Sequence, residues 1–416
     1  MEEEPRLKIP GVDRLDTMVD LLAKKPIEIE ARMCSRARHR QADCSRCVEV
    51  CAPEALTFSE KVDEIVAIDF SRCNGCGACA TVCPNGVFDY SFGLSDYELL
   101  QKIGLTVRDA DEVYFACSKS EEAVREASIA VTCFSRLHEG LLFGAAKLGA
   151  KQVYLASPGC EDCSFIQADN IEVLLREVAT LTGAFGFRTR FSLISDSEAV
   201  SACPTTALIE KEQPTRRELL EGMTGFLKKR SASWLDERLG PLMQKNQAVE
   251  VNGFLYRTPY KRKMLLGLAK DQKSRRKLNL SWLSYGGVLL DTANCSLCGD
   301  CALFCPTTAI AMESGDDGTH LVFYPAFCTV CGICELACRP GALETIKEIR
   351  TKDLATAAGR ALKSAGGRYC CVFCSTEFAA SEPAPLCPTC YELEKIRGNE
   401  QAGDGIEPIP ITPGQS

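Results

Sequence analysis

Histidine is scarce in this chain of 416 residues, which contains only His39, His138 and His320. We expect each of the three to be a surface or packing residue, so catalysis through an imidazole has little support. No G-x-G-x-x-G follows an expected strand, and no Walker A motif is present. The sequence therefore gives no sign of a flavin site, a nicotinamide site or a P-loop.

Long hydrophobic runs are also lacking. No stretch reaches the roughly 18 apolar residues that span a bilayer, so we expect no integral membrane segment. The opening MEEEPRLKIP is acidic and has no apolar core of a signal peptide, which predicts a cytoplasmic protein. Basic residues are not in excess either, and the net charge of −8 disfavours broad nucleic-acid binding.

Cysteine, in contrast, is abundant, with 26 residues. Cytosolic reductants keep thiols free, so such a count in a cytoplasmic protein indicates metal binding rather than a disulfide framework. Most of the cysteines lie in two groups of eight, at 34–83 and 295–338.

The second group contains the spacing C-x2-C-x2-C-x3-C twice. It is formed first by Cys295, Cys298, Cys301 and Cys305, and then by Cys328, Cys331, Cys334 and Cys338. In two-cluster ferredoxins the fourth cysteine of each run binds the other [4Fe–4S] cluster. One expected ligand set is therefore Cys295, Cys298, Cys301 and Cys338, and the other is Cys328, Cys331, Cys334 and Cys305. Zinc is disfavoured, because structural zinc prefers paired C-x2-C units.

The first group is regular in one half only. Cys73, Cys76, Cys79 and Cys83 repeat the pattern, whereas Cys44, Cys47 and Cys51 lack a partner at Gln41 and are preceded by Cys34. An insertion in the binding loop would let Cys34 supply the displaced thiolate. The expected sets are Cys34, Cys44, Cys47 and Cys83, and Cys73, Cys76, Cys79 and Cys51. A [3Fe–4S] site or a missing cluster is the alternative for the set with Cys34.

Both groups resemble the bacterial two-cluster ferredoxin fold, each over about 50 residues. The resemblance implies four [4Fe–4S] clusters and a role in electron transfer.

Between the two groups the pattern changes. The β-rich runs EVYFAC, SIAVTC, KQVYLA and RTRFSLI alternate with helical patterns, which predicts a parallel sheet covered by helices. Cys117 and Cys133 each close an expected strand, and Cys160 and Cys163 follow the third. The carboxyl ends of parallel strands meet at one edge, so these four thiols should converge there. They suit a [2Fe–2S] cluster, and buried structural thiols are the alternative.

This central region is similar to the delta subunit family of methyl-viologen-reducing hydrogenases. The similarity lies in VTCFSRLHEGLLFGAAKLGAKQVYLA and PGCEDCSFIQADN, within about residues 110–185. It implies a [2Fe–2S] cluster and a link between hydrogenases and heterodisulfide reductases. Two features depart from the family: Ser118 to Ser120 replace a second cysteine, and the last cysteine pair is more closely spaced.

Near the C-terminus, two C-x2-C units are formed by Cys371, Cys374, Cys387 and Cys390. Their spacing is typical of a zinc ribbon or a rubredoxin-like knuckle, and we expect zinc, with mononuclear iron as the alternative. Cys370 and Cys203 are left over. Cys203 begins CPTTAL, close to the CPTTAI at Cys305, and is either a structural thiol or the remnant of a degenerate ferredoxin repeat.

A basic segment at 257–277 lies between the central region and the second group. It could contact a membrane surface or nucleic acid. A solvated linker, or a docking face for an acidic partner, is the simpler interpretation.

We therefore expect an α+β multidomain protein in which two ferredoxin-like modules flank a central α/β parallel-sheet domain. The expected segments are an N-terminal helix (1–30), a first module (31–100), the central domain (108–200), a connector (201–285), a second module (286–350), a zinc-ribbon-like knuckle (366–396) and a disordered tail (397–416).

No residue pair is suited to transform an organic substrate, so we expect a non-catalytic electron-transfer subunit of an oxidoreductase in an anaerobe. It would belong to a hetero-oligomer with a donor and a catalytic partner: a hydrogenase, a heterodisulfide-reductase-like protein, or a flavin or molybdenum oxidoreductase. The alternatives are a regulatory or nucleic-acid-binding protein with structural clusters, and a self-contained oxidoreductase.

Overall fold

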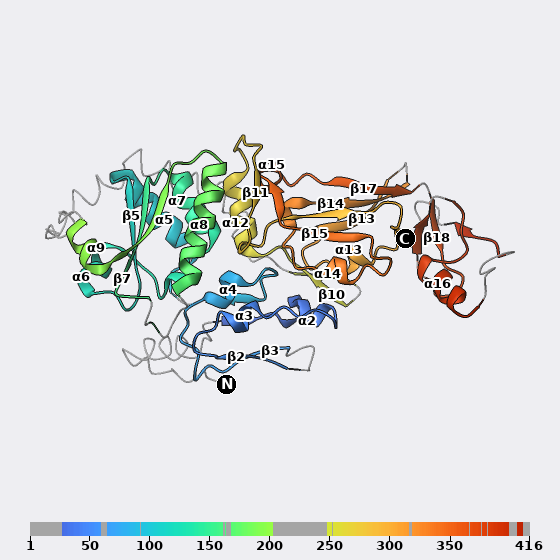
Figure 1. Cartoon of the computed structure of the whole chain (residues 1–416), viewed down its shortest axis with the longest axis horizontal. Coiled ribbons are helices and arrows are strands. Elements are labelled where there is room, and N and C mark those ends of the chain that lie inside the picture. The colour runs from blue at the N-terminus through green and yellow to red at the C-terminus, as the bar shows by residue number, and fades with distance from the viewer. Residues whose placement is uncertain are drawn as a thin grey trace, which may run out of the picture.

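A computed structural model of the chain has an elongated arrangement of four parts (Figure 1). It describes residues 27–59, 65–91, 93–160, 163, 168–202, 248–251, 253–315, 318–365, 367–375, 377–380, 382–398 and 406–410. Residues 1–26 of the expected N-terminal helix, Cys203 and residues 203–247 of the expected connector lie outside the described residues. Within the described residues, no helix is both long and apolar enough to cross a bilayer.

The first module is built from short elements. Its antiparallel strand pairs are β1 (Ile27–Ile29) with β4 (Phe88–Tyr90) and β2 (Leu56–Phe58) with β3 (Val66–Ile68). Its helices are η1 (Ala31–Met33), α2 (Ser35–Arg38), α3 (Arg46–Glu49) and α4 (Ala78–Val82). The apolar core is small and includes cysteines among its buried members.

The central domain contains the predicted parallel sheet, with strand order β6-β5-β7-β8. Its strands are β5 (Glu112–Ala116), β6 (Ile129–Ala130), β7 (Gln152–Ser157) and β8 (Arg190–Ser195). Its helices are α5 (Asp96–Asp109), α6 (Glu122–Ala127), η3 (Phe134–Arg136), α7 (Glu139–Leu148), α8 (Ala168–Ala184) and α9 (Asp196–Ala202). The prediction of a parallel α/β sheet is confirmed.

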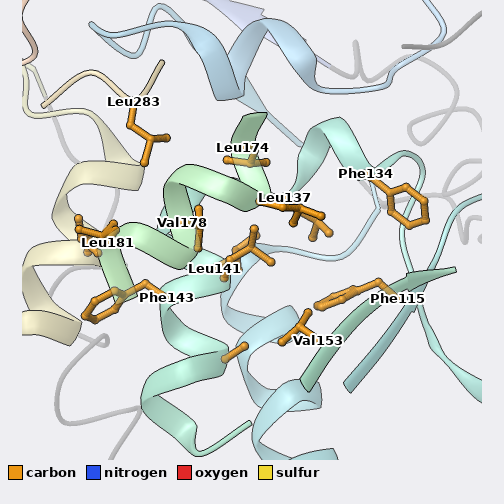
Figure 2. Close-up of a cluster of buried hydrophobic side chains, with 14 of the residues drawn as sticks. Phe115, Phe134, Leu137, Leu141, Phe143, Val153, Leu174, Val178, Leu181 and Leu283 are labelled. Carbon is orange, nitrogen blue, oxygen red and sulfur yellow. The ribbon is translucent and has the colours of Figure 1, made fainter. Parts of the chain in front are cut away.

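The strands of this sheet bury both faces. Phe115 and Val153 point into the larger core, which is shared with α7 and α8 (Figure 2). Ala116 and Ala156 lie on the opposite face, in a smaller cluster with residues of α6 and α9. This alternation follows from the two-residue period of a strand. Leu283, far along the chain, joins the larger core.

The basic segment forms α12 (Tyr260–Ala269), which packs on α7 and lies between the central domain and the second module (Figure 1). Its residues Met264, Leu265 and Leu268 are fully buried. This differs from the expectation of a solvated linker, because these apolar positions recur at helical spacing among the lysines and arginines. A hairpin of β9 (Val249–Val251) and β10 (Phe254–Tyr256) precedes the helix.

The second module pairs its strands antiparallel. These strands are β11 (Lys277–Asn279) with β16 (Glu348–Arg350), β12 (Gly287–Leu290) with β15 (Leu343–Ile346), and the sheet of β13 (Ile310–Gly315), β14 (Gly318–Phe323) and β17 (Arg360–Ala365). Its helices are α13 (Asp300–Phe304), η5 (Pro325–Phe327), α14 (Ile333–Leu336) and α15 (Thr351–Ala355).

The C-terminal knuckle follows β17 directly. It contains β18 (Gly367–Cys370), β19 (Glu377–Ala380) and α16 (Pro388–Ile396). A further strand, β20 (Ile409–Pro410), pairs with β18. This part of the tail therefore differs from the expected disorder, since it satisfies backbone groups on the open edge of β18.

Candidate iron–sulfur centres

The first module brings Cys34, Cys44, Cys47 and Cys83 together around one cavity, here called site A. Cys34 lies directly before α2, Cys47 lies in α3, and Cys83 directly follows α4. Gln41, the position where a regular motif would have its cysteine, is exposed. The structure therefore places Cys34, and not residue 41, beside the other three thiols.

The remaining four cysteines of this module, Cys51, Cys73, Cys76 and Cys79, line a second cavity, called site B. The backbone N–H of Ala55 donates to Cys51 Sγ over 3.3 Å. Such N–H donors stabilise negative charge on a ligating sulfur.

The second module contains two equivalent sites. Site C is a cavity lined by Cys305, Cys328, Cys331 and Cys334. Site D consists of Cys295, Cys298, Cys301 and Cys338, where the Cys301 thiol interacts electrostatically with the other three. In each module the last cysteine of a motif thus lies with the other motif, as the crossed pattern predicts.

Three of the four cysteine loops share one left-handed turn. The residue before the second cysteine has positive φ in Gly75, Leu297 and Val330, with values of 68°, 56° and 49°. The residue after it is glycine with φ of 81°, 83° and 75°, at Gly77, Gly299 and Gly332. Positive φ is unfavourable for a β-branched residue such as Val330, and strain of this kind concentrates at functional sites.

The loop of site A has a different backbone. Asp43 and Ser45 flank Cys44, the counterpart of the second cysteine, and Ser45 has a φ of −124° where the other loops have a left-handed glycine. The left-handed turn that wraps three corners of a cluster in the other loops is therefore not formed at Ser45. A thiolate from elsewhere in the chain is then needed, and Cys34 lies in place to supply it.

The cysteines of sites A to D are suited to bind a cluster whose iron ions carry positive charge. Burial raises the pKa of Cys34 to about 11 and that of Cys47 to about 12, and neighbouring thiols add to both shifts. In site C, burial raises the pKa of Cys331 to about 12, with a further contribution from Cys305. Four adjacent thiolates in such surroundings need compensating cations, which the iron ions of a cluster would provide.

The central cysteines follow the carboxyl ends of β5, β6 and β7. The Cys117 thiol interacts electrostatically with Cys133 and Cys160, and Cys160 interacts with Cys163. The structure therefore brings the four thiols to one edge of the sheet, here called the central site. Burial raises the pKa of Cys133 to about 12.

The serines that depart from the delta-subunit pattern have structural hydrogen bonds. Ser118 Oγ donates to the carbonyl of Thr132 over 2.9 Å. Ser120 Oγ accepts from the Cys117 N–H over 3.2 Å and donates to the carbonyl of Ala156 over 3.0 Å. These bonds tie β5 to the neighbouring strands and orient the Cys117 loop.

The knuckle holds a tighter group. The Sγ atoms of Cys371, Cys374, Cys387 and Cys390 all lie within 4.8 Å of one another, and Cys374 and Cys387 are 3.7 Å apart. Four sulfurs around one tetrahedral zinc ion, at the usual bond length, would be separated by about 3.8 Å. The group can therefore hold a single metal ion. Cys370 lies on β18, next to this group but not part of it.

The three histidines make structural contacts. His39 stacks edge-on against Phe304 at 5.7 Å, and His320 Nδ1 lies 2.7 Å from Ser364 Oγ. His138 caps α7, and its Nε2 lies 2.9 Å from Asp96 Oδ2.

The sites lie next to one another. Cys79 of site B interacts electrostatically with Cys47 of site A, and Cys301 of site D with Cys305 of site C. Cys133 of the central site interacts with Cys76 of site B.

Two hydrogen bonds join the central domain to the first module near Cys133 and Cys76. In the first, Tyr90 Oη lies 3.4 Å from Thr132 Oγ1, and the same hydroxyl donates to the carbonyl of Gly75 within the first module over 2.9 Å. Thr81 Oγ1 in α4 donates to the carbonyl of Ser135 over 2.6 Å.

Buried hydrogen bonds join site A to site C. Asn85 Nδ2 donates to Ser35 Oγ over 3.0 Å, and Thr329 Oγ1 donates to Asn85 Oδ1 over 3.1 Å. Ser35 follows Cys34, and Thr329 follows Cys328. The sequence does not predict these contacts. Each of the three residues lies one or two positions after a cysteine, and this position does not reveal a partner in another module.

Two parts of the chain match a known domain: residues 42–87 and residues 287–340 each match the 4Fe-4S dicluster domain. The prediction of two ferredoxin-type modules is thereby confirmed, although Cys34 lies outside the matched residues.

The chain is also similar to a selenate reductase subunit of Mesobacillus selenatarsenatis, with 30% identity over 105 residues. The match covers 24% of this chain and 35% of that protein, so the chain spans about a third of the relative's length.

Proposed function

We infer that this protein is an iron–sulfur electron-transfer subunit, which receives electrons from a donor protein and passes them to a catalytic partner. The two 4Fe-4S dicluster domains support this function, as does the similarity to a protein named as a reductase subunit. A [4Fe–4S] cluster supplies a one-electron carrier whose potential depends on nearby charge, hydrogen bonds and solvent.

Each of sites A to D would hold one [4Fe–4S] cluster through its four cysteines. The central site would hold a [2Fe–2S] cluster through Cys117, Cys133, Cys160 and Cys163, and the knuckle would hold zinc. The shared cavities of sites A, B and C support the first assignment. The convergence of strand ends supports the second, and the close sulfur group supports the third.

The observation that carries this function is the unbroken succession of sites. The order is central site, site B, site A, site C and site D, and each neighbouring pair is joined by interacting thiols or by short hydrogen bonds. Such an order suits conduction through the whole chain better than five independent structural metal sites.

The partners belong to the same proposal. The resemblance of the central region to hydrogenase delta subunits favours a cytoplasmic complex in an anaerobe, with a hydrogenase or a heterodisulfide-reductase-like protein at one end. A flavin or molybdenum oxidoreductase would also fit as the catalytic partner.

The test is anaerobic purification of the full chain, followed by iron and acid-labile sulfide analysis and by EPR after dithionite reduction. We expect about 18 iron ions per chain and several interacting [4Fe–4S]⁺ signals. Protein that holds zinc at sites A to D and almost no sulfide would refute the function. Clusters that dithionite cannot reduce, with salt-dependent DNA retention, would instead support the regulatory alternative.

A further inference from the structure

Arg38 is a first-module residue that reaches the second module. It ends α2, the helix that directly follows Cys34 of site A. Its side chain is buried, with the residue only 4% exposed, and its guanidinium interacts electrostatically with the thiols of Cys305 and Cys331 in site C. The residue therefore connects two neighbouring sites in different modules.

Aromatic rings surround the guanidinium. Its carbon lies 4.9 Å from the ring centroid of Tyr256 and 5.4 Å from that of Phe254. Tyr256 Oη donates to the carbonyl of Leu303 over 2.7 Å, which attaches this hairpin to α13 just before Cys305. Phe254 also contacts Phe304 edge-on at 5.2 Å. The rings keep water away and attract the cation through their faces.

Within the described residues, no oppositely charged side chain pairs with Arg38, and the polar group beside its guanidinium is the hydroxyl of Tyr256. Buried Nε and Nη1 have no hydrogen-bond partner, and Nη2 lies 4.0 Å from Met33 Sδ. Among the described residues, no carboxylate pairs with it. A buried charge without a partner is strongly unfavourable, so an anion absent from the bare chain is expected next to it. The thiolates of site C, together with the sulfides of their cluster, would be that anion.

Other arginines near the sites already have acceptors. Arg36 Nε donates to the carbonyl of Cys44 over 2.7 Å, and Arg46 Nη2 donates to the carbonyl of Trp282 over 3.3 Å. Arg262, also buried, donates from Nη2 to the carbonyl of Cys328 over 2.8 Å. Site C thus has two buried guanidiniums from outside its own module. Arg262 leaves Nη1 without a hydrogen-bond partner, whereas Arg38 leaves both Nε and Nη1 without one.

We propose that Arg38 is the counter-ion of site C and raises the reduction potential of the cluster bound there. The assignment of that cluster rests on the proposed function. Reduction adds one negative charge to the site, and a fixed cation in a water-poor interior stabilises that charge strongly. Arg38 would then favour electron transfer from site A to site C relative to a protein that lacks this charge. Arg38 acts on the cluster through its positive charge and does not ligate iron.

The experiment compares Arg38→Gln and Arg38→Met with Arg40→Gln in the full chain. Arg40→Gln removes the same charge two residues away. Arg40 is exposed, so water and salt screen its charge. Iron and sulfide contents are measured first, and redox titration is then followed by EPR. Both Arg38 variants should lower one cluster potential by at least 59 mV, a tenfold change in its one-electron equilibrium constant. Arg40→Gln should change each constant by less than twofold.

The shifted signal is assigned with Cys331→Ser, which alters a ligand of site C alone. Unchanged potentials in fully loaded Arg38 variants would overturn the proposal, as would a shift confined to site A. The Arg38 variants could also lose iron. Iron loss from site C supports the counter-ion role if Arg38→Lys restores the iron. Iron loss from site A overturns the proposal. Wild-type protein without reducible clusters would refute the proposed function itself, before any variant is compared.

Discussion

Cys34 is the residue on which the ligand set of site A depends. Cys34→Ala should lower the iron content by about four ions per chain, because three thiolates hold a cubane weakly. Gln41→Ala is the matched control, since this exposed side chain lies outside the cavity, and it should leave the iron content unchanged. A loss of about one iron ion would indicate a three-iron form, and no loss at all would contradict the assignment.

Asp96 holds together a buried charged network at the start of α5. It pairs with Arg136 and with His138, and both partners are buried. Asp96→Asn should lower the free energy of unfolding by about 3–5 kcal/mol, because it leaves Arg136 without its counter-charge. Asp111→Asn removes an exposed pair with Lys151 and should cost less than about 1 kcal/mol. Urea unfolding followed by circular dichroism measures both.

The pH dependence of this network follows from the pKa of Asp96. Burial alone would raise that pKa, but His138 and Arg136 outweigh it and hold the value at about 2. Because the folded-state pKa is depressed, the stabilisation is present above about pH 4 and is lost as the pH falls toward 2. The stability difference between Asp96→Asn and wild type should therefore shrink as the pH falls from about 4 toward 2. A difference that stays the same across that range would contradict the assignment.

Among the elements, those with a strong local pattern could be predicted from the sequence. The runs EVYFAC and KQVYLA became β5 and β7, because a short, nearly continuous run of apolar and aromatic residues can be recognised without distant information. The cysteine spacing likewise predicted which thiols meet at sites B, C and D. The burial of α12 could not be predicted, because Met264 and Leu268 are buried by contacts with helices that are distant in the sequence. Arg38 and Asn85 were missed for the same reason.

The knuckle is an element whose metal can be tested separately. Cys374→Ala should remove about one zinc ion per chain, because a structural site needs all four thiolates. Cys370→Ala changes the neighbouring thiol that lies outside the sulfur group, and it should leave the zinc content unchanged. Elemental analysis distinguishes zinc from iron in the wild type. Iron lost from Cys374→Ala in place of zinc would indicate a rubredoxin-like centre.

At the scale of the whole molecule, polar side chains join the two ferredoxin-type modules. Arg257 pairs with Asp89 of the first module over 2.8 Å, and its backbone N–H donates to the carbonyl of Pro306 in the second module over 3.0 Å. In the view of Figure 1, the first module lies below the second module. Together with the buried hydrogen bond between Thr329 and Asn85, these contacts favour a single geometry, and a fixed geometry keeps the spacing between sites A and C constant.

A linear order of sites limits the magnetic neighbours of each reduced cluster. Cys133 of the central site interacts with Cys76 of site B, whereas sites C and D lie beyond site A in the proposed order. Cys133→Ala should therefore remove about two iron ions per chain and slow the electron-spin relaxation of the site B cluster alone. Glu122→Ala, which changes an exposed residue of the nearby helix α6, should leave iron content and relaxation unchanged. EPR power saturation of the dithionite-reduced protein measures the effect. Altered relaxation at sites C and D would refute the linear order, because dipolar coupling falls steeply with distance.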